Sequence, residues 1–238
     1  MLEGDPERLS TEYRSLRIPE ISQLREPFHD LLEKLRERIK NGDYQLVIGD
    51  DASGRLPALL MHRVVRAVYR KSGRGELPLL FLAGSGGLQD SQRREKTEKL
   101  ESFIRSCIEE TPLRRVLIVT EVVQTGESLR PLCHVLQDLG LQYDIATVGI
   151  DPPDGTPERA CARLAGSLGG EVVYGMKGEP SVYGEHRLAG VQKLPEDLFA
   201  HRCDEVDGFD TDNSRKGARE ARAEIQSLSE ELSEWFSR

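Results

Sequence analysis

Short apolar segments alternate with amphipathic helices through most of this chain, and this alternation constrains the fold more than any other feature. Helical segments, with apolar residues three and four positions apart, separate the apolar runs. Strands joined by helices of this length predict an α/β fold, with a parallel β-sheet, helices on both faces and right-handed crossovers. Buried strands are expected at residues 44–48, 77–82, 116–119, 143–150 and 171–174.

Composition divides the chain into four predicted parts. Residues 1–17 are polar and unpatterned, which predicts a flexible arm, and residues 18–175 contain the α/β core. Residues 176–214 are rich in glycine, charge and turn residues, which predicts an irregular segment. Residues 215–238 form a predicted C-terminal helix. Its apolar spacing favours docking on the chain's own sheet, with a homodimer contact as the alternative.

The bulk properties narrow the class of protein. A chain of 238 residues is long enough for one sizeable core, and its formal charge of −8 would repel nucleic acid, so no nucleic-acid partner is expected. No apolar run approaches the roughly 20 residues that span a bilayer, and the first residues lack a signal-peptide pattern. We therefore expect a cytoplasmic protein without a membrane partner. No chemistry is assigned to the widely spaced Cys107, Cys133, Cys161 and Cys203.

The strongest site pattern lies where the third expected strand ends. Ligands of parallel sheets bind at the carboxyl ends of strands. There the chain delivers Glu121, turns at Gly126, and places the hydroxyls of Thr125 and Ser128 before a helix. Amides at a helix start, together with two hydroxyls, form an anion site. Helix capping alone would use the same residues, but their combination favours a phosphate site in which Glu121 faces the hydroxyls of an attached sugar.

This segment resembles the signature of the type I phosphoribosyltransferases. That signature is a hydrophobic strand, two acidic residues, two small or apolar residues, and then T/S-T-G-x-T/S. Here the strand 116–119, the second acid Glu121, the apolar pair 122–123 and the loop 125–128 match it. The resemblance spans about residues 40–175. It implies a divergent member of the family, with that family's α/β fold and a hood-like segment at 176–214.

The resemblance also implies roles for the loop residues. The 5′-phosphate of phosphoribosyl pyrophosphate would lie on the loop, and Glu121 would contact the ribose 2′ and 3′ hydroxyls. Thr120 stands where the family has its first acid, which weakens the ribose clamp, so the sequence predicts phosphate binding more firmly than turnover. The phosphate- and ribose-binding residues would be Thr120, Gln124, Thr125, Gly126, Glu127 and Ser128.

A second loop stands where the family carries its pyrophosphate loop. Arg55 could neutralise pyrophosphate through a bidentate contact. The resemblance implies Mg²⁺ as cofactor, which Asp50 and Asp51 could serve through water. The alternative is that Asp51 or Ser53 caps the next helix while Arg55 is solvated. The predicted pyrophosphate loop consists of Asp51, Ala52, Ser53, Gly54 and Arg55.

Weaker signals lie outside these two loops. Residues 84–99 take the place of the family's mobile loop. Their basic side chains are possible pyrophosphate partners, although the exposed face of the following helix is the commoner place for such charges. In the hood-like segment, His186 could touch a base, although a surface histidine is commoner. The acidic run 204–212 lacks the spacing of a calcium loop. The basic side chains are Arg93, Arg94, Lys96 and Lys99.

Two functions follow. The first is an enzyme that transfers ribose 5-phosphate from phosphoribosyl pyrophosphate to a nitrogenous base and releases pyrophosphate, with Glu121 and Arg55 as catalytic residues. The second is a non-catalytic module that senses a phosphoribosyl compound or nucleotide. The Ser53-Gly54-Arg55 loop favours the enzyme, and Thr120 at an acidic position favours the sensor. Either function has a small-molecule phosphoribosyl compound or nucleotide as its partner.

Overall fold

The computed structural model describes residues 15–83, 90–110, 113–152, 155–180, 182, 188–192, 197–202 and 211–238. Most of the predicted arm, residues 84–89 of the predicted mobile loop, His186 and most of the acidic run lie outside the described residues. Among the described helices, none combines the length and the apolar character needed to cross a membrane.

A five-stranded sheet, parallel throughout, forms the centre of the molecule, with strand order β2-β1-β3-β4-β5. The predicted fold class, a parallel sheet covered by helices on both faces, is confirmed. Every crossover places the carboxyl ends of the strands at the same edge of the sheet. The strands are β1 (Leu46–Asp51), β2 (Leu79–Ala83), β3 (Arg115–Val123), β4 (Gln142–Ile150) and β5 (Glu171–Lys177).

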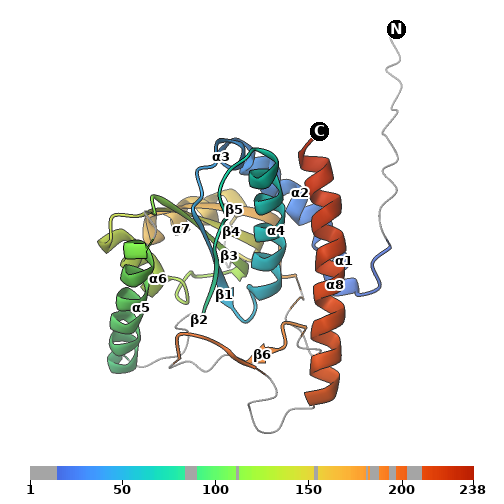
Figure 1. Ribbon diagram of the computed structural model, residues 1–238. Helices are drawn as coiled ribbons and strands as arrows, with labels where there is room; N and C mark the ends of the chain where they lie inside the picture. The colour runs from blue at the N-terminus through green and yellow to red at the C-terminus, as the bar shows by residue number, and fades with distance from the viewer. Residues whose placement is uncertain are drawn as a thin grey trace.

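Two hydrophobic cores cover the two faces of this sheet. Figure 1 shows α5 and α6 on one side and α4, backed by α8, on the other. The apolar residues of α2, α4 and α8 pack in one core, and those of α5, α6 and α7 pack in the second. The helices are α1 (Pro19–Ser22), α2 (Arg25–Lys34), α3 (Arg36–Asn41), α4 (Arg55–Lys71), α5 (Asp90–Glu110), α6 (Arg130–Asp138), α7 (Pro157–Leu168) and α8 (Thr211–Phe236).

The observed strands run further than the apolar runs that predict them. The first was expected to end at residue 48, but β1 continues to Asp51 because Asp50 and Asp51 pair with Leu82 and Ala83 of β2. In the same way β3 continues to Val123 through its pairing with β4. Polar residues at a strand end carry no apolar signal, so only the neighbouring strands reveal that they are extended. Asp50 therefore belongs to a strand rather than to a loop.

Two helix boundaries follow local signals, whereas one predicted helix is interrupted. Gly42 ends α3 in a left-handed conformation, and Thr156 caps α7 by accepting a hydrogen bond from the amide of Arg159, both as expected. One continuous helix was expected over residues 24–39. Instead Leu35 leaves the helical conformation and separates α2 from α3. This break bends the chain so that Phe28, Leu32 and other apolar residues on both sides of it stay buried in one core.

The C-terminal helix docks on the rest of the chain, but on helices rather than on the sheet. It begins at Thr211 and packs mainly along α4, with further contacts to α2. Glu231 forms an ion pair of 2.7 Å with Arg25, and Trp235 makes an edge-to-face contact with His29. The sheet face beneath is already covered by α4 and α2, so α8 forms a further layer outside them.

At the amino edge of the sheet, one buried carboxylate collects several donors. Asp144 of β4 is 1% exposed. It accepts hydrogen bonds from the Tyr44 hydroxyl at 2.8 Å and from Arg115 at 3.1 Å, and it forms an ion pair with Arg38 at 2.9 Å. Burial, with the neighbouring Asp144 carboxylate as a further cause, raises the pKa of Tyr44. These contacts join α3, the β1 entry, β3 and β4.

The predicted irregular segment crosses the opposite, carboxyl edge of the sheet. We call the described residues 178–180, 182, 188–192 and 197–202 the hood segment. It contains a two-stranded antiparallel pair, β6 (Val191–Gln192) and β7 (His201–Arg202), and Figure 1 shows β6 beyond the carboxyl ends of β1 and β2. The Ala83 amide donates to the Leu198 carbonyl at 2.7 Å, and Phe199 contacts Phe103 of α5. The hood segment therefore covers part of the edge where ligands of such sheets bind.

Candidate phosphate-binding site

The loop between β3 and α6 forms the turn that the sequence predicts. Gly126 has a φ of 76°, and its carbonyl accepts hydrogen bonds from the amides of Leu129 and Arg130, each at 3.1 Å. A Cβ on Gly126 would lie 3.0 Å from the Leu168 side chain. Backbone conformation and packing thus both require glycine. Because this turn closes before the helix, α6 begins at Arg130 rather than near Ser128.

The turn leaves backbone donors at the start of α6. Within the described part of the chain, no acceptor lies in hydrogen-bonding range of the amides of Thr125, Gly126 and Ser128. The amide of Glu127 makes a long contact of 3.4 Å with the Thr125 hydroxyl. Amides that point outward from a helix start carry partial positive charge and bind anions. The geometry of the loop therefore suits a phosphate group.

Two guanidinium groups flank the loop. The Glu127 carboxylate pairs with Arg130 at 2.9 Å, and Arg93 of α5 lies 4.0 Å from it. Arg93 was considered as a site residue from the sequence, but Arg130 was not. Its position two residues after Ser128 could have indicated a cation beside the loop. These cations add positive charge beside the outward-facing amides.

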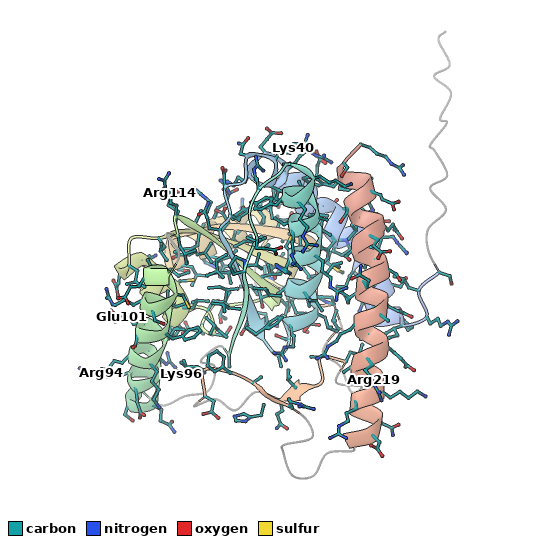
Figure 2. All side chains as sticks on the ribbon, in the orientation of Figure 1. Lys40, Arg94, Lys96, Glu101, Arg114 and Arg219 are labelled. Atoms are coloured by element: carbon teal, nitrogen blue, oxygen red, sulfur yellow. The ribbon has the colours of Figure 1, made fainter. Side chains whose placement is uncertain are left out.

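The four basic residues of α5 differ in exposure. Arg94 and Lys99 point to solvent, as expected for the outer face of a helix, whereas Lys96 is 2% exposed. Figure 2 shows Lys96 on the side of α5 that faces the sheet and Arg94 on the far side. The expectation of an exposed face is therefore wrong for Lys96, because Leu100, one turn later, sets the buried side of the helix.

Thr120 and Asp50 meet on the α5–α6 face of the sheet. Val116 and Ile118 of β3 point into the core beneath α5 and α6, and alternation along the strand carries Thr120 to the same face. The Thr120 hydroxyl lies 3.4 Å from Oδ2 of Asp50, and both side chains are buried. Asp50 and Ser128 line one small hollow of about 10 Å³, which has room for about one water molecule. The remainder of its lining is mostly apolar.

Glu121 points to the opposite face of the sheet and is 5% exposed. Its Oε1 accepts a hydrogen bond of 2.6 Å from the Val182 amide in the hood segment. The sequence placed Glu121 correctly at the carboxyl edge but gave no sign of this backbone partner. Sugar hydroxyls that reach this oxygen would compete with Val182.

The predicted pyrophosphate loop lies directly beside β3. A Cβ on Gly54 would meet the Val119 carbonyl at 2.8 Å, so only glycine allows this close approach. Ala52 is buried against Ala189 and Val191 of the hood segment. The structure thus brings the loop formed by Ala52, Ser53 and Gly54 next to the strand that leads to the 124–128 loop.

Arg55, the first residue of α4, stacks its guanidinium over the Phe81 ring of β2 at 4.4 Å. The side chain of Asp51 lies outside the described side chains. Stacking on an aromatic ring leaves the edge of a guanidinium available for an oxyanion. Arg55 is therefore not simply solvated.

Gln124 ties together the ends of three neighbouring strands. Its Nε2 donates to Asp151, directly after β4, at 3.3 Å, and also to Glu179, which follows β5. Gln124 points away from the Asp50 side of the site. The structure does not bring it into contact with the other predicted phosphate-loop side chains.

Asp50, predicted to serve Mg²⁺ through water, contacts the Thr120 hydroxyl. Among the described side chains, no group of three or more His, Cys, Asp or Glu residues is placed to hold a metal ion.

Comparisons with known proteins find loose structural likenesses and no sequence match. The sequence matches no protein-family model and no curated protein. A purine phosphoribosyltransferase from Pyrococcus horikoshii Ot3 is similar in structure, with 16% identity, a TM-score of 0.36, and coverage of 64% of this chain and 83% of that one. An orotate phosphoribosyltransferase from Aeropyrum pernix is similar with 20% identity, a TM-score of 0.37, and coverage of 63% and 68%. These likenesses are loose and indicate no ligand or activity for this chain.

Proposed function

We propose that this chain binds a phosphoribosyl compound at the carboxyl ends of β1 and β3, and that it acts as a phosphoribosyltransferase. One observation carries the proposal: the turn at Gly126 presents the amides of 125, 126 and 128 at the start of α6, beside two buried carboxylates, Asp50 and Glu121. Amides suit a phosphate, and carboxylates suit the hydroxyls of the sugar that carries it.

In the proposed reaction, the bond between ribose C1 and the pyrophosphate oxygen breaks, and its electron pair leaves with pyrophosphate. A ring nitrogen of the base forms the new bond to C1 and releases its proton to solvent. Glu121 would hold a ribose hydroxyl and place negative charge near the developing cation, while Arg55 would bind the departing pyrophosphate. Mg²⁺ stays a prediction, as a companion of the ligand's phosphates rather than a resident ion.

Titration calorimetry with ribose 5-phosphate and with phosphoribosyl pyrophosphate tests the binding half of this proposal. Pyrophosphate release, measured with Mg²⁺ over a panel of purine and pyrimidine bases, tests the transfer half. We expect both phosphates to bind and at least one base to trigger release. If neither ribose 5-phosphate nor phosphoribosyl pyrophosphate binds, the proposal as a whole is contradicted.

A second candidate, a non-catalytic sensor, is favoured by the hydrogen bond between Glu121 and the Val182 amide. A bound sugar would compete for that carboxylate and so bias the hood segment. In turn the hood contacts α8, since a Cβ on Gly190 would lie 2.7 Å from that of Ala218. Binding without pyrophosphate release for any base, together with altered protease protection of the hood segment, would support the sensor over the enzyme.

A further inference from the structure

Asp50 stands beside the position where the ribose clamp lacks an acid. Parallel pairing of β1 with β3 sets Gly49 against Val119, so the next residue of each strand, Asp50 and Thr120, are also neighbours. The Thr120 hydroxyl and Oδ2 of Asp50 are 3.4 Å apart. The carboxylate that position 120 lacks is therefore present on the adjacent strand.

Because of this short distance, positions 50 and 120 are not expected to carry an ionised carboxylate at the same time. An aspartate at 120 would place a second carboxylate against that of Asp50, which is only 6% exposed. Two carboxylates that share a buried site cannot both ionise at neutral pH. A hydroxyl at 120 avoids this repulsion and can donate to Asp50. Threonine at 120 is thus the residue expected when the acid has moved to β1.

Asp50 also lies close to the loop proposed for the 5′-phosphate. It lines one small hollow together with Ser128 of that loop. Glu121 lies on the other face of β3 and next to Thr120 in the chain. A ribose that lies across the end of β3 can meet one carboxylate from each face.

We propose that Asp50 is the second carboxylate of the ribose clamp, replacing the acid missing at Thr120 and accepting a hydrogen bond from one ribose hydroxyl while Glu121 accepts one from the other. This inference rests on the proposed function. It assigns Asp50 to the sugar rather than to the waters of Mg²⁺, and it names the ligand class as sugar phosphates with intact 2- and 3-hydroxyls.

The test is a calorimetric titration of the full chain, with EDTA present, against ribose 5-phosphate and its 2-deoxy and 3-deoxy analogues. Asp50→Asn should weaken binding of ribose 5-phosphate by about ten- to a hundredfold, the usual size of a hydrogen bond to a charged group. For one deoxy analogue the loss should disappear, because the hydroxyl that Asp50 holds is already absent. Asp138→Asn, at an exposed acid on α6, is the matched control and should change nothing.

An exchange of residues separates a role in sugar binding from a role in folding. Thr120→Asp alone should weaken binding, since it adds the second carboxylate. The double variant Asp50→Thr with Thr120→Asp returns the acid to β3 and should recover most of the affinity. Failure of the double variant to recover, or an equal loss for all three sugars with Asp50→Asn, would overturn the role of Asp50 alone. No binding of ribose 5-phosphate by the unaltered chain would overturn the proposed function and this inference with it.

Discussion

The two edges of the sheet hold buried carboxylates in opposite ways. At the amino edge, Asp144 accepts hydrogen bonds or ion pairs from Tyr44, Arg38 and Arg115, so its charge is compensated within the chain. At the carboxyl edge, Glu121 accepts a backbone amide, and Asp50 faces a hydroxyl at 3.4 Å. The named partners of Asp144 include two positive charges, whereas those of Glu121 and Asp50 include neutral donors, which a ligand hydroxyl could replace. The comparison separates an edge whose buried acid is ion-paired from the edge at which we propose binding.

The largest expected effect on stability lies at the amino edge. Asp144→Asn should lower the free energy of unfolding by about 3 kcal/mol, because Arg115 loses its counter-charge and Arg38 keeps only the exposed Glu171. Glu121→Gln should cost less than about 1 kcal/mol, since the amide oxygen can still accept from Val182. Urea denaturation of both variants measures the difference. Equal losses of unfolding free energy would show that the buried acids at the two edges contribute equally to stability.

Two glycines with similar backbone conformations, one at each edge, test whether only the carboxyl edge binds phosphate. Gly126, at the carboxyl edge, and Gly140, at the amino edge, have φ values of 76° and 69°. Valine at either position should cost about 1–3 kcal/mol of backbone strain, and at Gly126 its Cβ also meets the Leu168 side chain at 3.0 Å. Gly126→Val alone should also reduce affinity for ribose 5-phosphate by more than about a hundredfold, because the amides lose their arrangement around the phosphate. Calorimetry on both variants checks this, and unchanged affinity in Gly126→Val would remove the phosphate assignment.

Removal of the Glu121 side chain distinguishes binding from turnover at the carboxyl edge. Glu121→Ala should weaken phosphoribosyl pyrophosphate binding by roughly tenfold and lower pyrophosphate release by on the order of a hundredfold or more. The larger effect on turnover follows from the positive charge that develops on the sugar only in the transition state. Calorimetry and a pyrophosphate assay give the two values. Losses of the same size would mean that Glu121 only binds.

The smallest expected effects come from removing one hydroxyl at each edge. Tyr44→Phe should cost about 1 kcal/mol, because it deletes a buried 2.8 Å hydrogen bond to Asp144. Thr120→Val should change stability by less than about 0.5 kcal/mol, since a 3.4 Å contact is long for a hydrogen bond. Thermal denaturation compares the two variants. A larger cost for Thr120→Val would indicate that the pair with Asp50 stabilises the fold rather than preparing a site.

Local patterns predicted the elements and the turn at Gly126 because the signals are themselves local. Apolar alternation gave the order of strands and helices, and Gly126 with its flanking hydroxyls marked a turn before a helix. The ends of the elements escaped prediction where polar residues are involved. Asp50 and Asp51 look like a loop in the sequence, yet β2 holds them in a strand. Lys96 looks exposed in a charged helix, yet its position relative to Leu100 buries it.

Local sequence patterns alone specify a parallel α/β sheet and a tight turn at Gly126, because periodicity and backbone conformation depend on neighbours along the chain. Only the tertiary structure decided that Asp50 lies against Thr120, although 70 residues separate them. The tertiary structure also brings Val182 into contact with Glu121, and Arg38 and Arg115 into ion pairs with Asp144. Such contacts depend on which strands pair and on where the hood segment crosses the edge. Position 120 carries no acid in the sequence, and in the fold the carboxylate of Asp50 lies beside that position.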